Sequence, residues 1–106
     1  MAEINKESIT GTWRHYKTTY TSGKEYETKR GTEYNLYENG TMSCFVYTDN
    51  STVRDNTLQR WSLTDVNEGT GTLCFNESPR FRILKLEDKE MQLEDHNGIH
   101  YWKKGY

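Results

Sequence analysis

The histidines are the side chains of this sequence best suited to hold a metal or move a proton. His96 and His100 flank a tight turn, and His15 lies on a segment expected to become a neighbouring strand. A metal site requires the imidazoles to converge and a further group to orient each of them. Histidines on either side of a hairpin turn usually point apart or into water. We therefore expect surface histidines and no metal.

Acidic side chains gather at two predicted turns, one with Glu87, Asp88 and Glu90 and one with Glu94 and Asp95. Carboxylates of this kind could bind Ca²⁺ weakly, but they lack the ligand spacing of a dedicated calcium loop. We expect solvated turn charges, which also protect the nearby strand ends from pairing with other chains.

Catalysis finds little support in the residue pattern. No serine stands in a nucleophile elbow, and no glycine-rich phosphate loop occurs. A hydrolase-like set can be drawn from His15, Asp95 and Ser43, but almost any chain of this length permits one. We expect a protein that is not an enzyme and has no cofactor.

The two cysteines, Cys44 and Cys74, both lie in apolar runs, with no Cys-x-x-Cys spacing and no nearby histidine. This context favours buried free thiols. A disulfide is the alternative if the chain is extracellular.

The composition indicates one small domain with a thin, aromatic core. Only 32% of the 106 residues are hydrophobic, but eight tyrosines and three tryptophans supply large surfaces to bury, and the net charge is only −2. No apolar stretch is long enough to span a membrane. No basic field suits a nucleic acid, and Met1 to Lys6 contain no apolar run of the kind that a signal peptide has.

Alternating apolar and polar residues, rather than helical spacing, recur along the chain and predict an all-β fold. Turn residues divide the chain into eight expected strands, at 11–20, 25–38, 41–48, 55–64, 70–75, 80–87, 90–95 and 99–104. Two Asn-Gly pairs, at Asn39 and Asn97, are typical of tight hairpins. Eight antiparallel strands in an up-and-down order remove their exposed edges by closing into a barrel. We expect a barrel domain over 9–106, preceded by a segment over 1–8.

The alternation also predicts which residues face the interior. Gly31 marks a bulge or corner in the long second strand, and Leu84 and Leu86 break phase with Ile83. Trp102 is out of phase with Ile99 and Tyr101 and is expected to be partly exposed. The inward positions are expected to be Trp13, Tyr34, Leu36, Met42, Cys44, Val46, Trp61, Leu63, Leu73, Phe75, Phe81, Ile83, Met91, Leu93, Ile99 and Tyr101.

An ordered set of short motifs resembles the small bacterial lipocalin-like domains, which are calycin-type β-barrels. These motifs are Gly11-Thr12-Trp13, Leu36-Tyr37-Glu38-Asn39-Gly40-Thr41, Arg60-Trp61-Ser62-Leu63, Phe81-x-Ile83 with Leu86-x4-Met91-x-Leu93, and Tyr101-x-Lys103. They cover residues 9–104. The resemblance implies a secreted or periplasmic mature domain. It also implies a barrel plug in which Lys103, or its neighbour Lys104, lies over the Trp13 ring.

The expected function is the binding of a small ligand in the mouth of the barrel, with the ligand's identity left open. Five inward positions are expected to line that mouth: Lys17, Tyr34, Val46, Thr48 and Gln59. The alternative is a protein-interaction module with a filled barrel. Its binding surface would then be the 21–33 segment or the outer tyrosines, which are Tyr16, Tyr20, Tyr26, Tyr37 and Tyr47.

Overall fold

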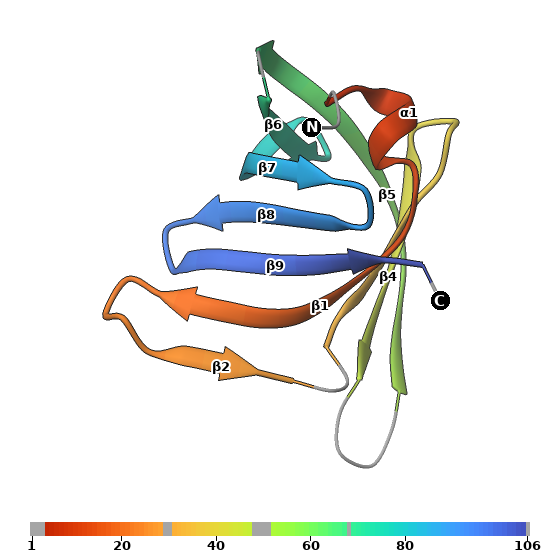
Figure 1. Ribbon diagram of the computed structural model, residues 1–106. Helices are drawn as coiled ribbons and strands as arrows, with labels where there is room; N and C mark the ends of the chain where they lie inside the picture. Colours follow the sequence, from red (N-terminus) through yellow and green to blue (C-terminus); the bar gives the residue numbers. More distant parts are fainter. Residues whose placement is uncertain (1–3, 29–30, 48–51, 68, 106) are drawn as a thin grey trace.

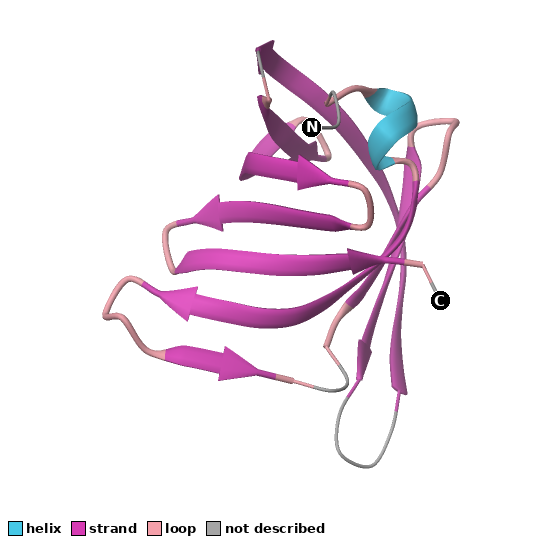
Figure 2. Cartoon of the chain, in the orientation of Figure 1, coloured by secondary structure: helices cyan, strands magenta, loops and turns pink. Residues whose placement is uncertain are grey.

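The computed structural model of the protein describes residues 4–28, 31–47, 52–67 and 69–105, with side chains for all of these except 46–47 and 52–58. One short helix, α1 (Lys6–Ile9), precedes the strands. The strands are β1 (Gly11–Tyr20), β2 (Glu25–Glu27), β3 (Glu33–Leu36), β4 (Thr41–Tyr47), β5 (Thr52–Asn67), β6 (Thr70–Phe75), β7 (Ser78–Glu87), β8 (Glu90–Asp95) and β9 (Gly98–Lys104). Figure 2 shows how strongly strand dominates.

The strands form a closed antiparallel barrel, which confirms the predicted fold class. From β3 to β9 each strand pairs with its neighbour in the sequence, and β1 closes the ring by pairing with β9. β2 and β3 pair with successive parts of the same edge of β1, so together they occupy one of eight positions around the barrel. In Figure 1, β2, β1, β9, β8 and β7 lie in one wall, while β4 and β5 run along another.

The predicted second strand is interrupted at Gly31, where the sequence indicated a bulge or corner. A side chain there would collide with the backbone carbonyl of His15. The His15 amide in turn donates a hydrogen bond to the Thr32 carbonyl at 3.0 Å. Glycine is required because β1 approaches the turning backbone so closely.

Of the five register irregularities in the described strands, three lie in β1 and β7. β1 shifts between His15 and Lys17, and β7 shifts between Ile83 and Lys85, where the phase break was expected. In the third place Leu73 pairs with Phe81 but Cys74 pairs with Pro79, so one extra residue is inserted in β7. An extra residue on one strand turns the following side chains to the other face.

The core fills the barrel around Trp13, which is completely buried. The helical segment contributes to the same core through Ile4 and Ile9, both buried. The remaining members are Leu36, Met42, Trp61, Leu73, Phe81, Ile83, Leu86, Met91, Leu93 and Trp102. The described residues include no helix long and apolar enough to cross a membrane.

The expected exposure of Trp102 is wrong, because its side chain is 1% exposed. It lies opposite the buried Met91 on β8 and stacks on Tyr34, with ring centroids 4.3 Å apart. Ile99 and Tyr101, expected inside, instead lie opposite Glu94 and Gln92, on the outer side of the wall. The large indole gains more from burial than the smaller residues beside it, so its burial sets the facing of β9.

Candidate functional site

A hollow opens in the barrel wall between β5 and the start of β7. β5 is paired with β4 up to Arg60 and with β6 only from Trp61 onward, so the described pairings leave its first half with one partner strand. The hollow has a volume of about 520 Å³ and is lined by Thr32, Tyr34, Met42, Cys44, Gln59, Phe75, Ser78, Pro79 and Arg80. We call it the mouth hollow.

Volume alone does not distinguish the mouth hollow, because four others of 410–540 Å³ lie elsewhere on the molecule. It is distinguished by two neighbouring aromatic rings in its wall, Tyr34 and Phe75. Met42 belongs to the core cluster, and Tyr34 and Phe75 pack against that cluster. The mouth hollow therefore reaches the barrel interior, and it combines aromatic surface with a few polar groups, as ligand sites do.

Tyr34 is the central wall residue of the mouth hollow. Its ring stacks on Trp102 and lies 6.0 Å from the Phe75 ring. Burial, reinforced by Cys44 and opposed by the Arg80 charge, raises the pKa of Tyr34 to about 12. The phenol thus stays protonated at neutral pH and offers a hydroxyl rather than a negative charge.

Arg80 brings the charge to the mouth hollow, and sequence reasoning missed it. It is the extra residue inserted in β7 between the paired Pro79 and Phe81. Strict alternation would send it outward, away from the buried Phe81. The bulge instead lets Arg80 border the hollow, with its guanidinium carbon 5.4 Å from the Phe81 ring centroid. Bulges re-aim side chains in this way beside functional sites.

A polar chain crosses the interior next to this aromatic cluster. The His100 Nε2–H donates to Asp95 Oδ1 at 2.9 Å, and His100 Nδ1 lies 3.0 Å from the Thr18 hydroxyl. That hydroxyl also lies 2.6 Å from His15 Nε2. The ring of Phe81 lies edge-on to His100 and contacts Trp102, linking the chain to the aromatic cluster.

The surroundings of the polar chain shift the pKa values of two of its members and restrict which groups can donate hydrogen bonds. Burial, followed by the nearby His100, lowers the pKa of His15, while a hydrogen bond with the Lys17 backbone opposes the shift. Burial alone would raise the pKa of Asp95, but hydrogen bonds from His100, Asn97 and Gly98 lower it overall. The single proton of the Thr18 hydroxyl can be donated to only one of the two imidazoles, so the other imidazole must donate to Thr18.

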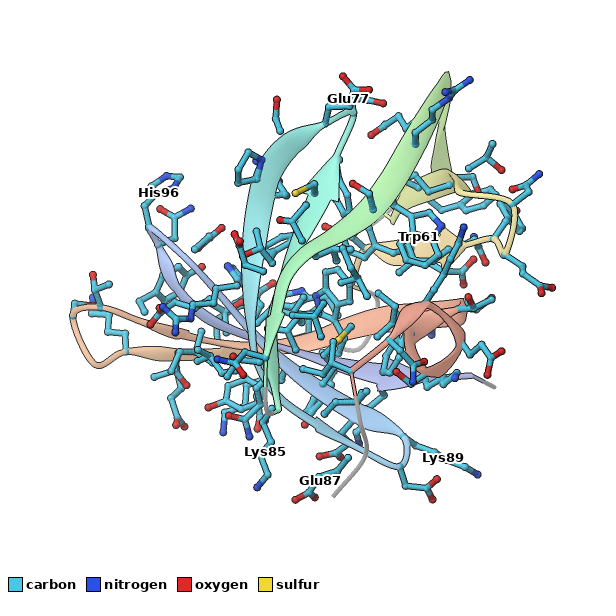
Figure 3. The ribbon with its side chains drawn as sticks, turned by 90° about the horizontal axis from the view of Figure 1, so that it is seen from above. Trp61, Glu77, Lys85, Glu87, Lys89 and His96 are labelled. Carbon is cyan, nitrogen blue, oxygen red and sulfur yellow. The ribbon has the colours of Figure 1, made fainter. Side chains whose placement is uncertain are left out.

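The polar chain corrects several expectations about the histidines and Asp95. His96 is exposed, as expected, but His15 and His100 are not surface side chains. Asp95 is mostly buried against His100 rather than solvated. Ser43, the third member of the hydrolase-like set, lies elsewhere and contacts the Tyr37 hydroxyl. Figure 3 shows His96 and Glu77 on one side of the molecule, with Glu87 and Lys89 on the opposite side.

Two of the five predicted mouth residues, Tyr34 and Gln59, line the mouth hollow. Lys17 does not. Its Nζ forms an ion pair with Glu25 at 3.4 Å and lies over the outer face of Tyr101. The bulge before Lys17 turned it outward and placed Thr18 inside. Thr48 lies outside the described residues, and for Val46 only the backbone, in β4, is described.

Of the two lysines predicted to lie over Trp13, Lys104 occupies that position and Lys103 does not. Lys104 Nζ lies 5.5 Å from the Trp13 ring centroid and donates to the Ser8 carbonyl. Trp13 and Lys104 are paired across β1 and β9, so both point to the same face. Lys103 lies outside, 4.5 Å from the ring of Tyr16.

The structure contains both cysteines as thiols. Cys74 is buried, and its sulfur lies 3.6 Å from the Thr64 hydroxyl. Cys44 is only partly buried and borders the mouth hollow. Within the described part of the chain, no three His, Cys, Asp or Glu side chains come together as a metal site would require.

A lipocalin-like protein from Bacteroides uniformis ATCC 8492 has a similar solved structure. It matches with a TM-score of 0.70 over 92% of this chain and 99% of that chain. The fold is lipocalin-like. The two sequences are only 13% identical, so this similarity shows the fold alone. No family model and no curated protein matches the chain.

Proposed function

We propose that this lipocalin-like barrel is a non-catalytic binding protein that holds one small molecule in the mouth hollow. The observation that carries the proposal is a 520 Å³ hollow whose walls include the inward side chains Tyr34, Met42 and Phe75. Drug-sized ligands occupy sites of about 300–1,000 Å³ with mostly apolar walls and a few polar groups. Eight-stranded barrels are wide enough to hold one small ligand where side chains do not fill the interior.

The non-catalytic part of the proposal is supported by the polar chain. Asp95, His100 and Thr18 have the carboxylate–imidazole–hydroxyl order of a hydrolase triad. A nucleophile must meet its substrate, however, and Thr18 is 3% exposed. Its hydroxyl is also held between His15 and His100. We assign these groups to the interior scaffold.

The test uses N-phenyl-1-naphthylamine, an uncharged dye that fluoresces in apolar surroundings. We expect the natural chain to bind it and Cys44→Phe, which fills the mouth hollow, to weaken binding by about tenfold or more. The matched control is Ser43→Phe on the same strand, whose side chain lies beside the outer Tyr37. Ser43→Phe should leave the affinity within about twofold of the natural value. Equal effects of the two variants would contradict the proposal.

The second candidate is the protein-interaction module. It is favoured by the exposure of Tyr20, Tyr26 and Tyr37, which are 42%, 48% and 48% exposed. Tyr16 and Tyr101 are less available, because Lys103 and Lys17 lie over their rings. If the natural chain binds neither this dye nor an anionic dye with the same aromatic body, the protein-interaction module becomes the better candidate.

A further inference from the structure

We propose that the molecule held in the mouth hollow is a small amphipathic acid, with an anionic head at Arg80 and a flat apolar body against Tyr34 and Phe75. This inference rests on the proposed function and adds the chemical class of the ligand. A carboxylate, sulfonate or phosphate head would share the same recognition chemistry.

The charge of the lining is the first observation. Among the nine lining residues whose side chains the structure describes, Arg80 alone carries a charged side chain. The ion pairs found among the described side chains are Arg14–Glu33, Lys17–Glu25, Lys85–Glu87 and His100–Asp95, and Arg80 is in none of them. No described carboxylate is therefore paired with this guanidinium, which has the geometry to bind an oxyanion with two parallel hydrogen bonds.

The placement of Arg80 is the second observation. The inserted residue in β7 brings this guanidinium to the opening and sets it beside the Phe81 ring. Arg82, two residues further along the same strand, is exposed and paired in regular register with Thr72 and Glu94. One strand therefore carries two arginines, and only the one at the bulge borders the hollow.

The apolar walls define the other end of the ligand. Tyr34 is held flat by its stack on Trp102, with an interplanar angle of 16°. Phe75 extends this aromatic wall, because its ring lies 6.0 Å from the Tyr34 ring and edge-on to the Phe81 ring. Because the raised pKa of Tyr34 keeps its phenol neutral, the wall does not repel an anion. The Tyr34 and Gln59 side chains, which also line the hollow, both carry hydrogen-bond donors.

The experiment compares two dyes that share one body. 8-Anilinonaphthalene-1-sulfonate is N-phenyl-1-naphthylamine with an added sulfonate, so the difference between their affinities reports the head group. We expect the natural chain to bind the sulfonate more tightly. Arg80→Gln should lower the affinity for the sulfonate dye by about fivefold or more. The affinity for the uncharged dye should stay within about twofold of the natural value. The control Arg82→Gln should change neither dye appreciably.

The outcomes separate the two proposals. If neither dye binds, or if Cys44→Phe weakens neither of them, the proposed function fails and this inference fails with it. If both dyes bind in the hollow with equal affinity, the barrel binds ligands without preferring acids, and this inference alone is overturned. It is also overturned if Arg80→Gln weakens both dyes equally, or if Arg82→Gln weakens the sulfonate as much as Arg80→Gln does. Far-ultraviolet circular dichroism of each variant checks that the barrel is intact.

Discussion

The Trp13 plug and the mouth hollow differ in how far their side chains are buried and hydrogen-bonded within the protein. At the plug, Trp13 is completely buried, its Nε1–H donates to the Ile9 carbonyl at 2.8 Å, and Lys104 covers the ring. The hydrogen-bonding groups are satisfied by nearby backbone. At the mouth hollow, Tyr34 stacks on Trp102, and Arg80 is exposed to solvent. The comparison shows that the plug is buried and closed by its own contacts, whereas the mouth hollow combines aromatic walls with an exposed positive charge.

The largest expected effect breaks the plug. Trp13→Ala should lower the free energy of unfolding by about 3–5 kcal/mol, because it leaves a cavity the size of an indole in the core. A domain of this size has about 5–15 kcal/mol in total. Chemical denaturation measures the loss. Trp102→Ala should cost a similar amount, because Trp102 is also buried. A much smaller loss for either variant would contradict the packing described here.

Lys104 tests the plug at a smaller scale. Lys104→Met should lower the free energy of unfolding by about 1 kcal/mol, because it removes the contact over Trp13 and the hydrogen bond to the Ser8 carbonyl. Lys103→Met is the matched control on the outer face, over Tyr16, and should cost a few tenths of a kcal/mol. Equal losses in urea denaturation would mean that the plug does not depend on which lysine covers it.

Acidification should lower the stability of the folded protein through the polar chain. The pKa of His15 is lowered in the folded state, so the unfolded chain binds more protons as the pH falls below about 6.5, and stability falls. The lowered pKa of Asp95 acts in the same direction below about pH 4. His15→Gln should flatten the dependence between pH 7 and pH 5, whereas the exposed His96→Gln should leave it unchanged. Thermal unfolding at several pH values measures both, and an unaltered slope in His15→Gln would exclude this role.

A further expected effect lies at alkaline pH, on the wall of the mouth hollow. Because the folded-state pKa of Tyr34 is raised to about 12, its contribution to stability is complete below pH 10 and is lost as the pH rises toward 12. Tyr34→Phe should reduce the loss of stability over that range. Ultraviolet titration of the phenolate gives a second measurement, and one fewer late-titrating tyrosine is expected in the variant.

Residue alternation predicted the barrel, its closure and the break at Gly31, because each of these follows from local pattern or from the need to hide strand edges. The facing of single residues was less predictable. Lys17 and Arg80 both depend on inserted residues in their strands, and the alternation around them does not reveal these two insertions, although it did reveal the one after Ile83. Pro79 was the one local indication, since proline in a strand favours an end or a bulge.

The polar chain could not be predicted from neighbouring residues. Thr18 and His100 are 82 positions apart in the sequence and meet only because β1 closes against β9. The same closure buries Trp102, whose local pattern indicated partial exposure. Where contacts join the two ends of the chain, the register of the closing pair decides which side chains meet, and one residue of slip exchanges the faces.

An NMR titration tests the division between plug and mouth hollow most directly. Amide resonances of the ¹⁵N-labelled protein would be followed while N-phenyl-1-naphthylamine is added. We predict the largest shifts at lining residues, Tyr34, Cys44, Gln59 and Arg80, with little change at Trp13 and Lys104. Shifts centred on the plug or on the outer tyrosines Tyr20 and Tyr26, or no saturable shifts at all, would contradict the assignment of ligand binding to the mouth hollow.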